Sequence, residues 1–175
     1  NMHDKRLMLE TSLKMPLIVR YPAAIKPGSV NDKLVMNIDF GPTMLDFAGV
    51  PVPKAMQGVS FRPLLEGKSP QNWRKAIFYA YYARAPMHWG IRTERHKLIH
   101  FPHVDSFEFY DLRKDPHEMK DASAEVGYSE IIEETEKQLA ELMEEVGVTR
   151  EYLLEHMKNN RRSPPRSYGR GKKKK

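Results

Sequence analysis

The sequence predicts an α/β fold that becomes α+β in its C-terminal part, where a small antiparallel sheet packs on a helix. Three observations support this fold class. A short apolar run lies between prolines at residues 16–22, β-rich stretches fill residues 76–112, and apolar residues recur at helical spacing over residues 129–146. The first pattern is typical of a buried strand, the second of antiparallel strands, and the third of an amphipathic helix.

The apolar run Pro16–Pro22 is too short for a helix and contains Ile and Val, so it predicts a buried strand at the end of an α/β sheet layer. A short helix should follow, with Asp39 as its N-cap and Gly49 at its C-terminal stop. The apolar side of this helix is expected to consist of Phe40, Met44, Leu45 and Phe47.

A Gly-, Ser-, Pro- and Asn-containing connection at residues 67–73 precedes a change in the pattern of the chain. Three β-rich stretches are expected after it: Ala76–Tyr82, Trp89–Arg92 with Lys97–Phe101, and Phe107–Leu112. Their partial alternation of apolar and polar residues favours an antiparallel sheet with one covered face. A long helix is predicted over residues 129–146, with acidic residues in its first turns, and a short helix over residues 149–157.

The net charge of +6 is concentrated at the C-terminus. Residues 161–175 carry eight Arg and Lys residues and no acid, so removing these eight from +6 leaves −2 for residues 1–160. The segment 158–175 has no bulky aliphatic residues and is predicted to be a disordered basic tail. Such a tail can bind polyanions non-specifically, but Tyr168 is its only aromatic residue, which disfavours a nucleic-acid partner.

The composition restricts the chemistry of the chain. There is no cysteine, and therefore no disulfide framework, thiolate metal site or cysteine nucleophile within these residues. No apolar run approaches the roughly 18 residues of a membrane helix, so no membrane span is expected. The histidines lack the paired spacing of a zinc site, and we assign no metal ligands. The chain begins at Asn1 without a signal-peptide pattern, which favours an internal start, as in a fragment.

The most informative stretch is residues 4–22, which has the pattern D-K-R-x-x-x-E-x-S-x-x-x-P-L-I-V-R-x-P. This opening motif resembles that of the type I sulfatases, which depend on formylglycine and belong to the alkaline-phosphatase-like superfamily. The group most similar to this chain acts on 6-sulfated N-acetylglucosamine. Further stretches that resemble the family lie at residues 37–51, 56–65, 88–99 and 109–119.

The resemblance implies a domain organisation. Residues 1–66 would form the C-terminal end of the sulfatase catalytic domain, including the end of its α/β sheet layer, and residues 67–157 the C-terminal subdomain, an antiparallel sheet packed on a helix. The basic tail at residues 158–175 would follow. The resemblance also points to a periplasmic, extracellular or lysosomal location, although nothing in the chain itself specifies a compartment.

The resemblance further implies three site residues. Lys5 matches the family lysine that binds a sulfate oxygen at the reaction centre, where a compact ammonium stabilises negative charge in the transition state. Asp4 and His88 match positions that contact sugar hydroxyls, a task that suits a carboxylate and an imidazole. A capping role for Asp4 and an ordinary edge-strand role for His88 remain open alternatives.

The family nucleophile and most of the metal site are not found in this sequence. Type I sulfatases make formylglycine from a C/S-x-P-S-R motif, and their calcium ion is bound by acidic pairs upstream of the opening motif; neither occurs here. Calcium and formylglycine are therefore expected only in the parent enzyme. The chain alone is predicted to be inactive, because it can stabilise charge but has no nucleophile.

Two other functions remain possible at this point. A phosphodiesterase or phosphonate hydrolase of the same superfamily has a similar Pro-Leu-Ile-Val-Arg strand and the same α/β layer. Alternatively, the chain is a non-enzymatic module in which the small sheet and the basic tail bind a polyanion. The preferred hypothesis is a sulfatase fragment whose partner is a sulfated carbohydrate.

Overall fold

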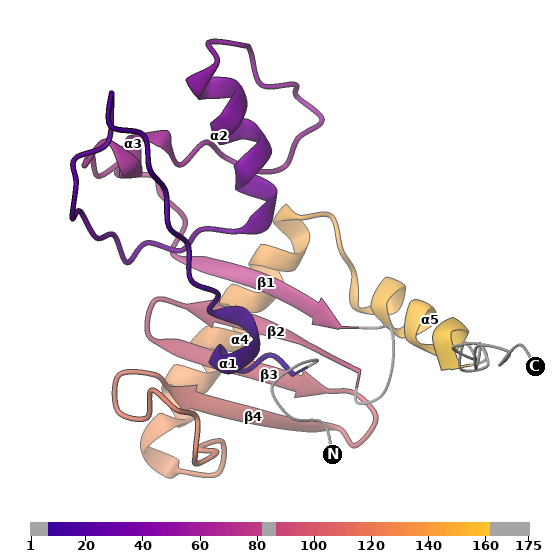
Figure 1. Cartoon of the computed structure of the whole chain (residues 1–175). Coiled ribbons are helices and arrows are strands. Elements are labelled where there is room, and N and C mark those ends of the chain that lie inside the picture. Colours follow the sequence, from indigo (N-terminus) through magenta and orange to yellow (C-terminus); the bar gives the residue numbers. More distant parts are fainter. Residues whose placement is uncertain (1–6, 82–86, 162–175) are drawn as a thin grey trace, which may run out of the picture.

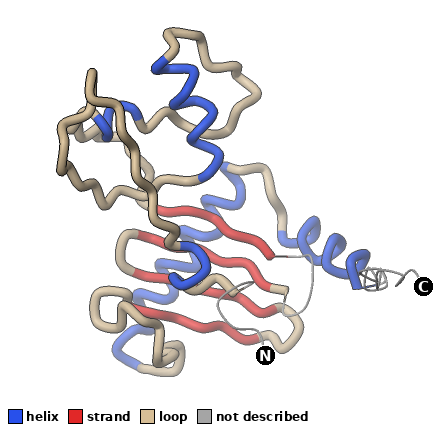
Figure 2. The backbone as a smooth tube through the Cα atoms, in the orientation of Figure 1, coloured by secondary structure: helices blue, strands red, loops and turns tan. Residues whose placement is uncertain are grey.

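The computed structural model describes residues 7–81 and 87–161, with side chains described up to Lys158. Within these ranges one antiparallel sheet lies between two layers (Figure 1). The long helix α4 (Ser129–Glu145) crosses one face of the sheet, and the short helix α1 (Glu10–Leu13) lies on the other. Residues 14–66 lie beyond the β1 edge of the sheet and consist mostly of loops, as Figure 2 shows.

The sheet contains four strands in the order β1-β2-β3-β4, each antiparallel to its neighbour. Their bounds are Ala76–Tyr81 for β1, His88–Thr93 for β2, His96–Phe101 for β3 and Ser106–Asp111 for β4. The predicted antiparallel sheet is therefore confirmed, and the second of the three β-rich stretches forms two strands, β2 and β3. Its register places Gly90 opposite Ile99 and Leu98 opposite Phe109.

The main core lies between the sheet and α4. Alternate strand residues point to this side, and they pack against helix residues four positions apart, so both periodicities meet at one interface. The buried residues of this core include Trp89, Ile91, Leu98 and Phe109 from the sheet, Leu139 and Met143 from α4, and Leu153 and Met157 from α5.

The predicted long helix is confirmed to within one residue at its C-terminal end. The 3-10 helix η2 (Val126–Tyr128) leads into α4, and Gly147, with a φ of 69°, follows its last turn. Gly147 suits this position because a left-handed φ ends a helix without a Cβ clash. Helix α5 (Arg150–Arg161) begins at the predicted place but continues to Arg161. The start of the tail, expected at residue 158, therefore lies within α5, and residues 162–175 lie outside the described part.

The opposite face of the sheet is covered by the segment that ends in α1. Met8 is fully buried there against Ile99 and Tyr110. Gly90 permits this close packing: a Cβ atom at Gly90 would lie 3.0 Å from Met8 Sδ and only 2.1 Å from the Leu98 carbonyl oxygen. The absence of a side chain at residue 90 thus brings the opening motif directly onto the backbone of the sheet.

The loop-rich part contains η1 (Asn37–Asp39), α2 (Phe40–Phe47) and α3 (Arg62–Leu65). Asp39 is fully buried and organises this region, because its carboxylate accepts hydrogen bonds from the Met36 and Val59 amides at 2.7 and 2.9 Å. The same carboxylate forms a bidentate pair with Arg74, whose Nη2 lies 2.7 Å from Oδ1. Arg74, which lies just before β1, is thereby bound to Asp39 at the start of α2.

Two details of the predicted N-terminal region are wrong for this chain. Asp39 is the N-cap residue of α2, as predicted, although its side chain makes no cap hydrogen bond to that helix and binds Arg74 instead. The expected apolar side of α2 is only partly covered, since Met44 is 69% exposed. Gly49 does follow the helix with a φ of 68°, as expected for its C-terminal stop.

The second correction concerns Pro16–Pro22, which forms no strand. Its most apolar side chain, Ile18, is 91% exposed, and the strands of the described sheet all lie at residues 76–111. A strand requires a hydrogen-bonding neighbour, and none of the four sheet strands pairs with this segment. Within the described ranges, no helix combines the length and the hydropathy that crossing a bilayer requires.

We predict that Gly90→Ala will destabilise the chain by about 1–3 kcal/mol, the usual cost of overpacking, because its methyl group would meet the Leu98 carbonyl. Urea denaturation measures this change. Gly127→Ala is the matched control, since a Cβ at Gly127 meets no atom within 4 Å. Equal stability of the two variants would contradict the close packing at Gly90.

Candidate functional site

The three site residues suggested by the sequence fall into two groups. Asp4 and Lys5 lie outside the described residues. His88 is the first residue of β2 and is fully buried. Its imidazole lies among aromatic rings, with centroid distances of 5.8 Å to Tyr79, 5.7 Å to Tyr81 and 5.3 Å to Phe101. His88 therefore packs against three aromatic side chains.

His88 and the opening motif share one face of the sheet. Along β2, side chains alternate between faces, so His88, Gly90 and Arg92 point to the same side. Met8 packs against Gly90 on this side, and Glu10 contacts Arg92. The opening motif and the 88–99 stretch, far apart in the sequence, are thus adjacent in the fold.

Four charged side chains hold this contact together, and we refer to them as the Lys97 network: Glu10, Arg92, Lys97 and Glu118. The ammonium of Lys97 is fully buried, with Nζ 2.8 Å from Glu10 Oε1 and 2.5 Å from Glu118 Oε1. The Arg92 guanidinium donates to both carboxylate oxygens of Glu10, at 3.2 and 2.9 Å. Two cations and two anions therefore balance each other beneath α1.

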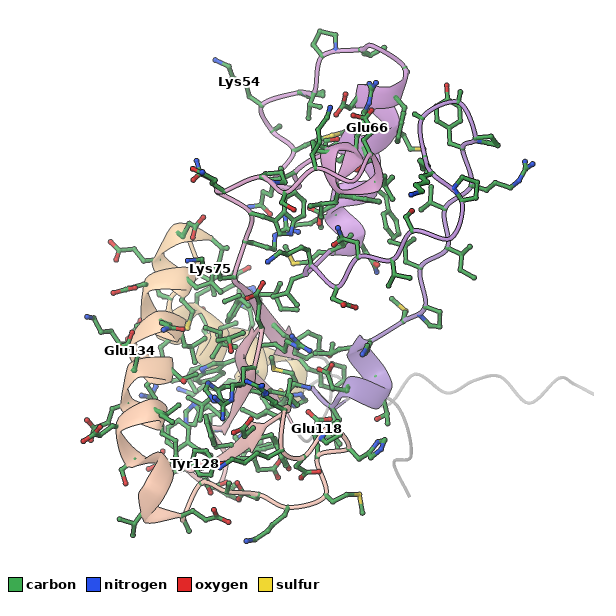
Figure 3. The ribbon with its side chains drawn as sticks, turned by 90° about the vertical axis from the view of Figure 1, so that its left-hand side faces the viewer. Lys54, Glu66, Lys75, Glu118, Tyr128 and Glu134 are labelled. Carbon is green, nitrogen blue, oxygen red and sulfur yellow. The ribbon has the colours of Figure 1, made fainter. Side chains whose placement is uncertain are left out.

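Glu118 adds a second link to α1. Its Oε2 accepts a hydrogen bond from the backbone N–H of Glu10 at 2.6 Å, while its Oε1 binds Lys97. This satisfies one of the backbone donors that the first turn of a helix leaves without an intrahelical partner. Figure 3 shows Glu118 on the side of the sheet where α1 lies, and Glu134 on the α4 side.

The carboxyl group of Glu10 stays ionised in this setting. Burial by itself would raise the pKa of Glu10, but hydrogen bonds and charges from Arg92 and Lys97 outweigh it and lower the pKa to about 2. The Glu10 carboxylate therefore carries its negative charge at neutral pH. The ordinary pKa of such a carboxyl is 4.5.

A second buried acid, Asp111, lies at the end of β4 on the α4 face of the sheet. Asp111 accepts hydrogen bonds from Arg95 Nε and Nη2 at 3.0 and 2.6 Å and from the Tyr128 hydroxyl at 3.2 Å. The Arg95 hydrogen bond is the main reason that the pKa of Asp111 lies far below its usual value. This cluster joins β4 to the start of α4. It does not take part in holding the opening motif.

None of the four residues of the Lys97 network was predicted as a site residue, although Glu10 and Arg92 lie within the stretches that resemble sulfatases. The available signal was the strand His96–Phe101, in which a lysine directly precedes the apolar pair Leu98-Ile99. A lysine on a covered strand needs a buried anion. The sequence does not show that this anion comes from residues 10 and 118.

The described residues do not fit the calcium ion that the resemblance implies. Among them there is no group of three or more His, Asp or Glu side chains that could hold a metal ion. The four charges of the Lys97 network are already paired with one another. We therefore assign no chemical step to a metal ion held by the described residues.

Two clefts lie on the α4 side of the sheet. One is formed by Lys75, the β2–β3 turn and the first half of α4, and the other by Trp89, His100 and Phe107 with the end of α4 and the start of α5. Neither is lined by His88. The face that bears the opening motif is therefore distinct from both clefts.

Together, the four-stranded sheet, its covering helix and the opening motif docked beside His88 define the C-terminal part of a sulfatase-type hydrolase. Comparison with known proteins identifies the family. The chain belongs to the family described as N-sulphoglucosamine sulphohydrolase, C-terminal, which it matches over residues 1–145.

Two curated relatives show the same class. The chain is 47% identical over 150 residues to the N-acetylglucosamine-6-O-sulfatase of Bacteroides thetaiotaomicron, an alignment that covers 77% of this chain and 27% of that protein. It is also 47% identical over 79 residues to the N-acetylglucosamine-6-sulfatase of Bos taurus, covering 45% of this chain and 14% of the relative. The chain thus spans about a quarter or less of the length of these relatives.

Solved structures agree with this assignment. The protein BT4656, determined in complex with its substrate D-glucosamine-2-N,6-O-disulfate, superimposes with a TM-score of 0.68 at 45% identity, covering 73% of this chain and 27% of that one. A phosphonate monoester hydrolase from Silicibacter pomeroyi reaches a TM-score of 0.63 at 23% identity, covering 72% of this chain and 28% of that one. The latter likeness shows the fold alone.

We predict that the stability of the chain will fall as the pH drops from about 4.5 towards 2, partly because of Glu10. In this window the unfolded chain binds a proton at residue 10 that the folded chain does not, so the free energy of unfolding rises with pH. Urea denaturation over pH 2–7 measures the effect. Glu10→Gln should lose most near neutral pH and approach the wild type near pH 2.

The control for this experiment is Glu141→Gln, which changes an exposed residue on α4. It should follow the wild-type pH profile throughout. A Glu10→Gln profile parallel to the wild type would show that the Glu10 pKa is not lowered by folding.

Proposed function

We propose that this chain is the C-terminal part of a sulfatase that hydrolyses sulfate esters of a sugar such as 6-sulfated N-acetylglucosamine. The observation that best supports this is the docking of the opening motif on the face of β2 that bears His88, with Met8 against Gly90 and Glu10 on Arg92. The motif that resembles the sulfatase reaction centre is thereby brought next to the strand that resembles its sugar-contacting position.

Within this proposal, Lys5 is the catalytic residue. Its ammonium would donate hydrogen bonds to a sulfate oxygen and stabilise charge that shifts as the sulfur–oxygen bond to the sugar breaks. Covalent geometry supports a site near this face, since three residues place the Cα of Lys5 within about 11 Å of the Cα of Met8. Asp4 and His88 would bind sugar hydroxyls.

His88 is fully buried against the aromatic rings of Tyr79, Tyr81 and Phe101, and its role here follows from its match to the sugar-contacting position of the family. A site that hydrogen-bonds a sugar hydroxyl discriminates against analogues that lack it, because the polar group would be left buried and unsatisfied. His88 would therefore contribute to specificity more than to the rate of the chemical step.

Calcium and formylglycine belong to the parent enzyme in this proposal. In type I sulfatases formylglycine supplies the nucleophile and calcium offsets the charge of the sulfate. The residues that would provide them are not found in this sequence.

We also propose that residues 1–66 complete a catalytic domain, that residues 67–157 form the C-terminal subdomain, and that the tail starts after it. The support is the distribution of exposed apolar side chains, which gather in the first of these segments: Met15, Ile18, Val30, Met44 and Val59 are 53–91% exposed. Extensive exposed apolar surface is typical of a region that other polypeptide covers. The remaining polypeptide of a sulfatase catalytic domain would cover them.

The chain alone should not hydrolyse 6-sulfated N-acetylglucosamine or a chromogenic aryl sulfate, because no nucleophile is present. A discontinuous sulfate-release assay on the purified 175-residue chain tests this. Turnover above the buffer blank would refute the proposal that the nucleophile lies outside this chain.

A chimera tests the function itself. Replacing the matching 27% of the Bacteroides thetaiotaomicron N-acetylglucosamine-6-O-sulfatase with this chain should retain activity on 6-sulfated N-acetylglucosamine. In the chimera, Lys5→Ala should lower kcat by about 10²-fold or more with the melting temperature unchanged, as expected for loss of an oxyanion-stabilising group. Lys120→Ala, which removes an exposed lysine of the same chain, is the control. Equal kcat values for the two variants would remove Lys5 from the site.

The same chimera distinguishes sulfatase activity from phosphonate hydrolase activity. It should prefer the sulfate ester to a phosphonate monoester of the same leaving group. The opposite preference would assign the chain to the second activity, which the fold by itself does not exclude.

A further inference from the structure

We propose that the Lys97 network is a positioning device: it fixes α1, and with it the opening motif, relative to His88. This inference rests on the proposed function, because its purpose is to set where Asp4 and Lys5 meet the substrate. The four residues come from four separate segments, namely α1, β2, β3 and the β4–η2 connection. None of them would touch the substrate, so they act through the segment that they hold.

The geometry suits a rigid attachment. Both oxygens of Glu10 are bound, and its backbone N–H is bound as well, so the first residue of α1 has three fixed points. A bidentate guanidinium–carboxylate pair constrains direction as well as distance. Apolar packing of Met8 alone would allow sliding along the sheet, whereas these contacts permit only one placement.

The conformation of Glu118 supports the same conclusion. Its φ is 53°, in the left-handed region that residues other than glycine seldom adopt. Such a conformation persists where surrounding contacts determine it, and such residues cluster at functional sites. Here the two determining contacts are those to Lys97 Nζ and to the Glu10 amide.

The chemistry of Lys97 argues against a purely stabilising role. Burying an ammonium carries a large desolvation cost that its carboxylate partners offset, so an apolar residue of similar size would often serve stability equally well. A charged pair, in contrast, has defined partners. The network thus selects one position of α1 at little net gain in stability.

Hydrogen exchange tests the attachment in the chain as it is. Glu118→Ala removes the acceptor of the Glu10 amide, so that amide should exchange at least tenfold faster, while the β2–β3 amides keep their protection. Glu125→Gln, which breaks only an exposed ion pair with Lys120 in the same connection, should change neither. Unchanged exchange at Glu10 in the Glu118→Ala variant would overturn the attachment.

Kinetics in the chimera test its consequence. Glu118→Ala should lower kcat by about 10²-fold, the effect of a displacement near 1 Å, while KM changes less than threefold. Its melting temperature should fall, because buried Lys97 loses one of its two carboxylate partners, so it is compared with the Glu125→Gln control at a temperature at which both are folded. A kcat equal to the control, with the Glu10 amide released, would overturn positioning. If Lys5→Ala is fully active, the proposed function fails instead, and the exchange result still decides whether the network holds α1.

Discussion

The fold depends on neutralising a lysine ammonium inside the sheet. Lys97 is fully buried on β3, and its charge would be strongly unfavourable without the carboxylates of Glu10 and Glu118. Because Glu10 lies 82 positions from its other partner, Arg92, this requirement brings the beginning of the chain onto the middle of the sheet. The remaining features on that face, including the Met8–Gly90 contact, follow from the same placement.

Secondary structure was largely predictable where the pattern and the packing surface belong to the same chain. The strands around Trp89 and Ile91 alternate as expected, and Leu139 and Met143 repeat at helical spacing, because both sets bury against each other. The strand expected at Pro16–Pro22 failed for the complementary reason. An apolar run indicates that a segment is suited to burial. It does not specify the neighbouring strand with which that segment would pair.

The candidate site was predictable only in outline. Family resemblance singled out Lys5, Asp4 and His88, and the fold brings the strand of His88 next to the opening motif. The resemblance could not assign a role to Glu10. That role depends on Lys97 and Glu118, which no local spacing in the sequence connects to Glu10. Long-range ion pairs leave little trace in sequence, because any acid at any distance can satisfy a buried cation.

The antiparallel order of the sheet has a consequence for how the chain folds. Every strand pairs with the one that follows or precedes it, so the sheet and α4 form through short loops with a low entropic cost. Glu10 must instead close a loop of 82 residues to reach Arg92. Docking of the opening motif therefore follows formation of the sheet, because the partners of Glu10 come from β2, β3 and the segment after β4.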